Sequence, residues 1–192
     1  MKRRPTSPIF PPARRASVRG VAMLEVLISL LIVAFGILGL FGMQAQASVA
    51  QMESYQRAQA LVLVKDMAQR LEANRTNAAD YLTGANDAGA TAPGDCSTKT
   101  TTAARDLCEW GTLLQGAAEL DSSNNKVGAM IGARGCISKP DPISKPNLYL
   151  VAVAWQGLRE TGAPPVDCGK NAYSSEPARR AATVVVRIPV LS

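Results

Sequence analysis

One long apolar block near the amino terminus is the most prominent feature of the hydrophobic and polar pattern. No residue from Val26 to Met52 is charged, and within Val26–Met43 the only polar side chain is Ser29. A helix of about 18 residues rises about 27 Å, close to the thickness of the hydrocarbon core of a bilayer. The pattern therefore predicts a membrane-spanning helix over 21–48.

Helical spacing of apolar residues continues beyond this block. The chain has no Pro between Met43 and Pro93, and Glu53–Arg57 and Asp66–Arg70 are i,i+4 pairs in the favourable acid-first order. The stripe expected to face a core consists of Leu61, Val64, Ala68 and Leu71. We therefore expect one helix from Val21 to about Arg75, whose second half packs on a globular domain.

The remainder of the chain carries strand patterns. Apolar and β-branched residues predict strands over 147–156 and 182–190, and a weaker strand over 127–137. A short second helix is expected over 106–120, after an irregular connection at 76–105. A long helix followed by an antiparallel sheet is an α+β fold, in which the second half of the helix covers one face of the sheet.

The net charge of +6 comes from the amino-terminal leader alone. Residues 1–20 hold six of the 21 Lys and Arg and none of the 15 Asp and Glu, so the rest of the chain is formally neutral. Because the domain has no basic surplus and aromatic residues make up only 5%, we expect no nucleic-acid partner. A basic segment directly before an apolar helix instead keeps that end in the cytoplasm.

Glu25 is the one charged residue inside the hydrophobic block. A carboxylate at the centre of a membrane helix costs about 2.5–3.5 kcal/mol on insertion scales, and less near an interface, so it needs a partner. Cleavage after Gly20 would create a free amine on Val21, one helical turn away. That amine could pair with Glu25 of its own chain, or with Glu25 of a neighbouring chain, where the pair would set the register of packed helices.

The segment 19–27, Arg-Gly-Val-Ala-Met-Leu-Glu-Val-Leu, resembles the class III signal of type IV prepilins, which has a basic leader, a Gly before the cut and Glu as fifth residue of the mature helix. The resemblance implies a pilin-like fold, cleavage between Gly20 and Val21 by a prepilin peptidase, N-methylation of Val21 and subunit docking through Glu25. The family usually has Phe at the position of Val21. The long leader, and Gly42 where major pilins tend to have Pro, suggest a minor pilin.

Further segments resemble the PilV-type minor pilins; they are 57–75, Cys108–Trp110, 151–157 and 168–169. The resemblance implies a leader at 1–20, a transmembrane helix at 21–48 and a periplasmic pilin-like domain at 49–192. It places the chain first in the inner membrane and then in the pilus. The implied partners are other minor pilins, the major pilin, the prepilin peptidase and the inner-membrane assembly machinery. The implied roles are priming of pilus assembly, twitching motility and adhesion.

Two other interpretations stay open. Pseudopilins of type II secretion systems share the amino-terminal signal, which therefore does not separate them from pilins. The motif Ala45-Gln46-Ala47 would also suit signal peptidase, which would release a secreted periplasmic binding domain. Against secretion, the apolar segment is longer than the usual 7–15 residues of a signal peptide and has Glu25 near its start.

Four cysteines in a chain that crosses to the periplasm predict two disulfides; they are Cys96, Cys108, Cys136 and Cys168. Three connectivities are possible, and we prefer the sequential pairs Cys96–Cys108 and Cys136–Cys168. A zinc site with all four cysteines as ligands is the competing interpretation, but no C-x2-C or C-x4-C spacing occurs.

No feature of the sequence indicates catalysis. The chain has no His, which excludes His-based triads, His metal sites and His proton shuttles. It also has no P-loop with which to power assembly. We interpret Trp110 and Trp155 as core aromatics. The expectation is a structural protein that is not an enzyme and uses no cofactor or metal.

Overall fold

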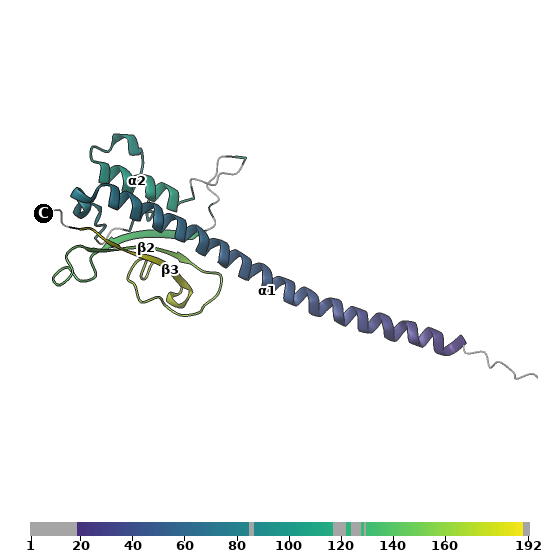
Figure 1. Ribbon diagram of the computed structural model, residues 1–192. Helices are drawn as coiled ribbons and strands as arrows, with labels where there is room; N and C mark the ends of the chain where they lie inside the picture. The colour runs from purple at the N-terminus through teal and green to yellow at the C-terminus, as the bar shows by residue number, and fades with distance from the viewer. Residues whose placement is uncertain (1–18, 85–86, 117–121, 124–127, 129, 190–192) are drawn as a thin grey trace, which may run out of the picture. The chain divides into compact units, whose positions relative to one another are not determined.

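The computed structural model describes residues 19–84, 87–116, 122–123, 128 and 130–189. The leader predicted at 1–20 lies outside these residues, apart from the helical backbone of Arg19 and Gly20. The chain forms two compact units, Met1–Gln46 and Ala47–Ser192. Helix α1, Arg19–Ala73, begins in the first unit and ends in the second (Figure 1).

The described part of the first unit consists of α1 alone. Every side chain from Val21 to Gln46 is exposed, and three glycines, Gly36, Gly39 and Gly42, lie within the helix without interrupting it. A helix that is apolar on all sides is stable only where lipid or other helices cover it. This part of α1 therefore needs a surrounding that the described residues of the chain do not supply.

The second unit is an α+β domain, as the sequence predicts. Its helices after α1 are η1 (Arg75–Tyr81), η2 (Cys96–Thr98), α2 (Thr102–Leu114) and η3 (Glu176–Ala178), and its strands are β1 (Ile131–Ser138), β2 (Leu148–Gln156) and β3 (Arg179–Arg187). The strands form one antiparallel sheet in the order β1-β2-β3. The last turns of α1 and helix α2 lie on one face of this sheet (Figure 1).

The bounds of α2 differ from the predicted 106–120 because local capping decides them. The Thr101 hydroxyl accepts a hydrogen bond from the Ala104 amide at 3.2 Å, so the helix begins one turn earlier than expected. It ends at Leu114, because Gly116 takes a φ of +82° and its amide donates to the Leu113 carbonyl at 2.9 Å. The sequence pattern located this helix but misjudged both of its ends.

The core of the second unit lies between the sheet and the two helices. Its main residues are Ala60, Val64, Met67 and Leu71 from α1, Trp110 and Leu114 from α2, and Tyr149, Val151, Val153, Trp155 and Val186 from the sheet. Both tryptophans are buried, as predicted. Leu61 was expected in the core but is 38% exposed, because the buried stripe of α1 runs through Ala60 and Met67 instead.

One predicted ion pair of α1 forms and the other does not. Arg70 Nε lies 3.1 Å from Asp66 Oδ2, as the i,i+4 spacing predicts. Glu53, however, does not pair with Arg57. Its Oε1 lies 3.4 Å from Nη2 of Arg180 on β3 and accepts a hydrogen bond from the Arg159 amide at 3.1 Å. Folding thus gives Glu53 partners from β3 and from the β2–β3 connection that the helix alone cannot offer.

Candidate functional site

The candidate site is the apolar part of α1 around Glu25. The large hydrophobic side chains from Val21 to Met43 are 47–73% exposed. By its length and composition, α1 is long and apolar enough to cross a membrane. Ser29 Oγ donates to the backbone carbonyl of Glu25 at 2.7 Å. From Val21 onward, no described side chain pairs with the Glu25 carboxylate. The carboxylate is therefore available to a partner outside the described chain.

The other predicted residues of this segment lie directly before Glu25. Gly20 is in the first helical turn of α1, and Val21 follows with its side chain exposed. Cleavage between Gly20 and Val21 and N-methylation of Val21 stay predictions. The helix puts Val21 and Glu25 one turn apart on the same side, as i and i+4 positions require.

Arg70 pairs with three carboxylates, and the two from α2 join that helix to α1. Besides Asp66, its Nη1 lies 3.0 Å from Asp106 Oδ1 and 2.6 Å from Glu109 Oε2. Burial alone would lower the pKa of Arg70, but the hydrogen bond to Glu109 and the charge of Asp66 outweigh it and raise the pKa above its usual value. Arg70 therefore stays charged and holds α2 against α1.

Tyr81 extends this network at the end of η1. Its hydroxyl donates to Asp106 Oδ2 at 2.5 Å and accepts from Asn74 Nδ2 at 3.1 Å. Burial, followed by the hydrogen bond to Asp106, raises the pKa of Tyr81 to about 12. The hydroxyl therefore remains a donor at neutral pH. The sequence identified only the Asp66–Arg70 part of this network, because the other carboxylates come from α2.

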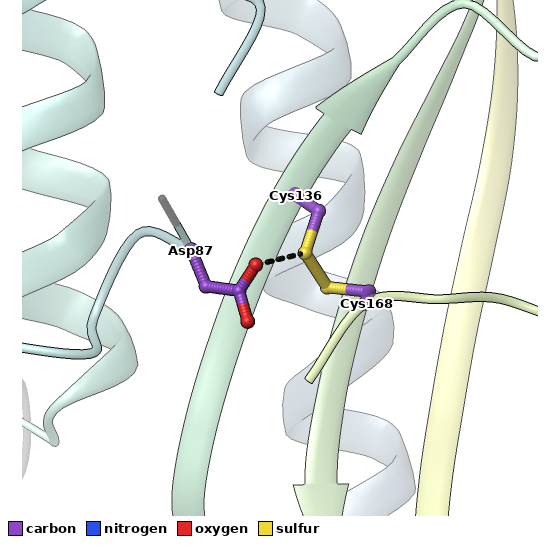
Figure 2. Close-up of side chains that lie close together, drawn as sticks. All are labelled: Asp87, Cys136 and Cys168. Atoms are coloured by element: carbon purple, nitrogen blue, oxygen red, sulfur yellow. Dashed lines mark hydrogen bonds between the residues drawn. A yellow bond between two sulfur atoms is a disulfide. The ribbon is translucent and has the colours of Figure 1, made fainter. Parts of the chain in front are cut away.

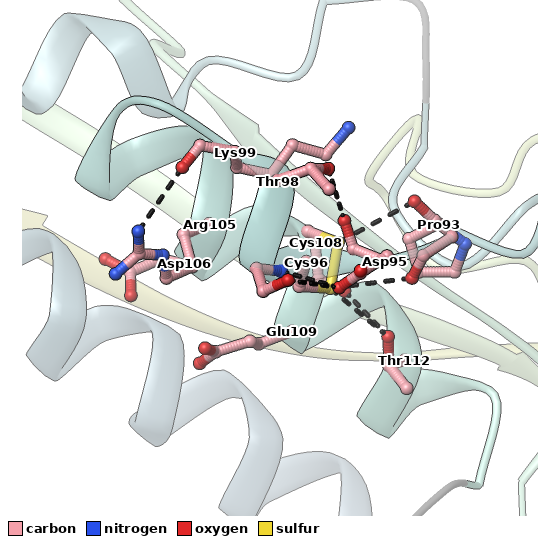
Figure 3. Close-up of a disulfide and its surroundings, with 12 residues drawn as sticks. Pro93, Asp95, Cys96, Thr98, Lys99, Arg105, Asp106, Cys108, Glu109 and Thr112 are labelled. Atoms are coloured by element: carbon pink, nitrogen blue, oxygen red, sulfur yellow. Dashed lines mark hydrogen bonds between the residues drawn. A yellow bond between two sulfur atoms is a disulfide. The ribbon is translucent and has the colours of Figure 1, made fainter.

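The first disulfide, Cys96–Cys108, ties η2 to α2 (Figure 3). Asp95 caps η2 by accepting the Ser97 amide at 2.9 Å, which orients the turn that carries Cys96. On α2, the Thr112 hydroxyl donates to the Cys108 carbonyl at 3.0 Å. The Cys96–Cys108 disulfide closes a short loop. Like other disulfides, it stabilises the fold mainly by restricting the unfolded chain.

The second disulfide, Cys136–Cys168, ties β1 to the β2–β3 connection on the sheet face opposite the helices. Together with the first, it is the sequential pairing that the sequence favoured. Figure 2 shows Asp87 beside it, with Oδ1 3.1 Å from Cys136 Sγ. A disulfide sulfur carries no proton, so this is a close contact and not a hydrogen bond. The other oxygen, Oδ2, accepts from the Gly169 amide at 3.1 Å.

Asp87, Cys136 and Cys168 bring three potential metal-ligand atoms within 4.8 Å of one another. A cysteine binds a metal as its thiolate, however, and both sulfurs here are joined in a disulfide. The cluster therefore serves as a structural tie, in which Asp87 fixes the loop after η1 to the connection that carries Cys168. Nothing in the sequence pattern singles out Asp87 for this position.

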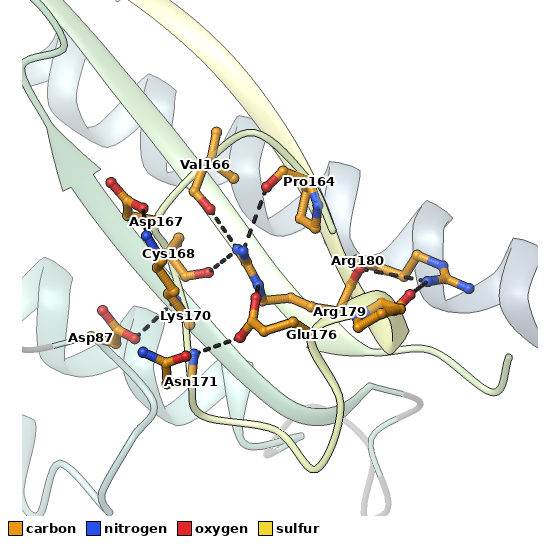
Figure 4. A network of polar contacts seen from close by, with 12 residues as sticks. Asp87, Pro164, Val166, Asp167, Cys168, Lys170, Asn171, Glu176, Arg179 and Arg180 are labelled. Carbon is orange, nitrogen blue, oxygen red and sulfur yellow. Dashed lines mark hydrogen bonds and ion pairs between the residues drawn. The ribbon is translucent and has the colours of Figure 1, made fainter. Parts of the chain in front are cut away.

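Arg179 organises the β2–β3 connection from the start of β3 (Figure 4). Its side chain is only 3% exposed, and its Nη1 donates to the carbonyls of Val166 at 2.5 Å and Cys168 at 3.0 Å. Its Nε lies 2.8 Å from Glu176 Oε2. A hydrogen bond from the Asn171 amide is the main cause of the lowered pKa of Glu176, with Arg179 also contributing. Sequence analysis missed Arg179, since an Arg next to another Arg at a strand edge carries no signal of burial.

Replacing Arg179 by methionine is expected to lower the free energy of unfolding by about 3–5 kcal/mol. The change leaves the Val166 and Cys168 carbonyls without their donor and Glu176 without its cation. Lys170→Met is the matched control: the Lys170–Asp167 pair in the same connection is exposed, so its loss should cost less than about 1 kcal/mol. Urea unfolding of the full chain in detergent micelles measures both. Equal effects of the two changes would contradict the organising role of Arg179.

Comparison with known proteins locates the similarity in the first part of the domain. Residues 42–113 match the family model Tt1218-like, described as type IV pilin Tt1218. The match includes the last part of α1, the Cys96–Cys108 disulfide and almost all of α2. No curated protein and no solved structure is significantly similar to the chain.

The matched segment and the apolar helix are consistent with each other. Type IV pilins are structural subunits that assemble with other pilins, which is consistent with the expectation of a structural protein. The match spans less than half of the chain and does not distinguish the PilV type. Over residues 42–113 the chain is similar to type IV pilins, and its exposed apolar helix fits a membrane-anchored pilin.

Proposed function

We propose that this chain is a minor pilin of the PilV type. It inserts in the inner membrane with its leader in the cytoplasm and its domain in the periplasm. A prepilin peptidase cuts between Gly20 and Val21, and the Val21 amine is methylated. The processed chain then joins other minor pilins and the major pilin, and helps to prime assembly of the fibre used for twitching motility and adhesion.

The observation that carries this proposal is the apolar segment Val21–Gln46 of α1, which is exposed on every side and whose only acid, Glu25, has no partner among the described side chains from Val21 onward. Covering such a helix with lipid accounts for its apolar surface but not for the carboxylate. Packing it among the helices of other subunits accounts for both, since the amine at Val21 of a neighbour can neutralise Glu25. The pair then selects one register among many that apolar packing alone would allow.

The continuity of α1 favours retention of the apolar segment over its removal by signal peptidase. The A-x-A motif ending at Ala47 lies in the middle of α1, and the helix continues without a break to Ala73. Cleavage there would cut this helix and separate the apolar segment from the domain. We therefore favour the pilin over the secreted binding domain, while a type II secretion pseudopilin stays an alternative with the same membrane behaviour.

The mature amino terminus tests this function directly. Mass spectrometry of the chain purified from membranes is expected to find a first residue of N-methylated Val21. A chain that begins at Ser48 would contradict the proposal, since it would lack both Glu25 and the apolar segment. Recovery of the Val21 form in sheared pili, and its presence when type II secretion is deleted, separates a pilin from a pseudopilin.

A further inference from the structure

A hollow in the second unit begins where the charge-free run of α1 ends. Its lining residues are Ala50, Glu53, Ser54, Arg57, Trp155 and Arg180. Ala50 follows closely on the segment 21–48 that the proposed function places in the membrane. Residues that directly follow a membrane-spanning segment lie at the level of the headgroups. With 21–48 in the bilayer, Ala50 therefore lies in the periplasmic headgroup region.

Two cationic residues at the hollow, Arg57 and Arg159, have side-chain donors that are free for a ligand. Arg180 is already engaged, because it pairs with Glu53 and donates to the carbonyls of Arg159 at 2.5 Å and Pro177 at 3.2 Å. Arg57 lines the hollow, and the backbone amide of Arg159 donates a hydrogen bond to Glu53, which also lines it. Both side chains are exposed, and within the described part of the chain neither has a hydrogen bond or ion pair.

The acids near the hollow are already engaged. Glu53 is held by Arg180 and the Arg159 amide, and Glu160 accepts a hydrogen bond from Ser175 Oγ at 2.6 Å. Three arginines against two acids leave a positive site, with the Ser54 hydroxyl as a further donor on α1. Guanidinium groups recognise phosphate oxygens by paired hydrogen bonds, so two free guanidinium groups at this site favour a phosphate ligand.

The surroundings also suit a lipid more than a free ion. Two large exposed side chains neighbour residues of the site in the sequence. Tyr55 follows the lining residue Ser54 on α1, and Leu158 directly precedes Arg159. Tyrosine is enriched at the headgroup level of membranes, and an exposed leucine there can contact acyl chains. A free phosphate would use the cations but leave these apolar groups in water.

We propose that this hollow binds the phosphate of an anionic phospholipid headgroup through Arg57 and Arg159. The site deepens the proposed function and rests on it, since it operates while the chain is stored in the membrane. Arg180 and Glu53, which pair with each other, shape the hollow and do not bind the phosphate.

Electron spin resonance of spin-labelled lipids in vesicles that contain the full chain tests the site. Spin-labelled phosphatidylglycerol is expected to associate more strongly with the chain than spin-labelled phosphatidylcholine. The double change Arg57→Gln and Arg159→Gln should lower this preference at least about fivefold, the effect of one basic residue at an anionic surface. The matched control, Arg75→Gln with Lys139→Gln, removes the same charge from a separate hollow near Ile188 and should leave the preference unchanged.

Three outcomes would overturn the proposal in distinguishable ways. If the double variant keeps the wild-type preference while still floating with the vesicles, the headgroup site is wrong and the pilin function stands. If added inorganic phosphate removes the preference at constant ionic strength, the site binds a free ion and not a lipid. If the wild-type chain floats with neither phosphatidylcholine nor phosphatidylglycerol vesicles, the membrane-anchored function itself fails, and this inference fails with it.

Discussion

Replacing Glu25 by alanine is expected to leave the chain in the membrane but to lower its recovery in sheared pili at least about tenfold. Insertion should not suffer, because the change removes a carboxylate that is unfavourable within an apolar membrane helix. Docking should suffer, because the amine of a neighbouring Val21 would be left in an apolar bundle without its counter-charge. Breaking a buried ion pair from one side costs about 3–5 kcal/mol, enough for more than a tenfold loss.

The measurement compares the chain in the membrane fraction with the chain in sheared fibres, both by quantitative immunoblot. Glu25→Gln keeps the shape and removes the charge, so it should behave like Glu25→Ala. Ser29→Ala is the matched control one turn further along. It removes the hydrogen bond from Ser29 to the Glu25 carbonyl and keeps the carboxylate, so normal incorporation is expected. Wild-type recovery of Glu25→Ala in fibres would argue against docking through this residue.

Replacing Trp110 by alanine is expected to lower the free energy of unfolding by about 3–5 kcal/mol. The side chain is completely buried where α2 meets α1 and the sheet. Its Nε1 donates to the Leu63 carbonyl of α1 at 3.0 Å. Its ring covers Gly135 so closely that a Cβ on that glycine would lie 2.4 Å from two ring carbons. Alanine would therefore leave a cavity between α1, α2 and the sheet, and would remove the hydrogen bond from α2 to α1.

Urea unfolding of the full chain in detergent micelles, followed by circular dichroism, measures this loss. Trp110→Phe keeps most of the ring and loses the indole donor, so a smaller cost of about 1–2 kcal/mol is expected. Ile143→Ala is the surface control, because Ile143 is 92% exposed and should change stability by less than about 0.5 kcal/mol. A cost for Trp110→Ala no larger than that of the control would mean that α2 does not depend on this contact.

The amino-acid sequence predicted those features that depend on residues close together in the chain. The apolar block, the helix that continues from it and the strong strands follow from periodicity, which is local. The even number of cysteines, in a chain expected to cross to the periplasm, likewise favours disulfides without knowledge of the fold. Glu25 is recognisable for the same reason, since a single acid in an apolar helix is unexpected wherever that helix lies.

What the sequence could not predict depends on which distant residues meet. Glu53 has Arg57 at the right helical spacing, yet it pairs with Arg180, 127 residues further along. Ala60 and Met67 enter the core in place of Leu61, because the sheet and α2 decide which face of α1 is covered. Arg179 became buried because carbonyls of a folded connection converge on it.

The sequence by itself thus determined a membrane-type helix with one acid, an α+β domain and the parity of its cysteines, because composition and short-range spacing carry this information. Only the tertiary structure decided the buried face of α1, the network of Arg70 with α2 and the hollow at Ala50 that Arg57 and Arg180 line. Such contacts join residues far apart in the chain, and their partners exist only after the sheet and helices have packed together.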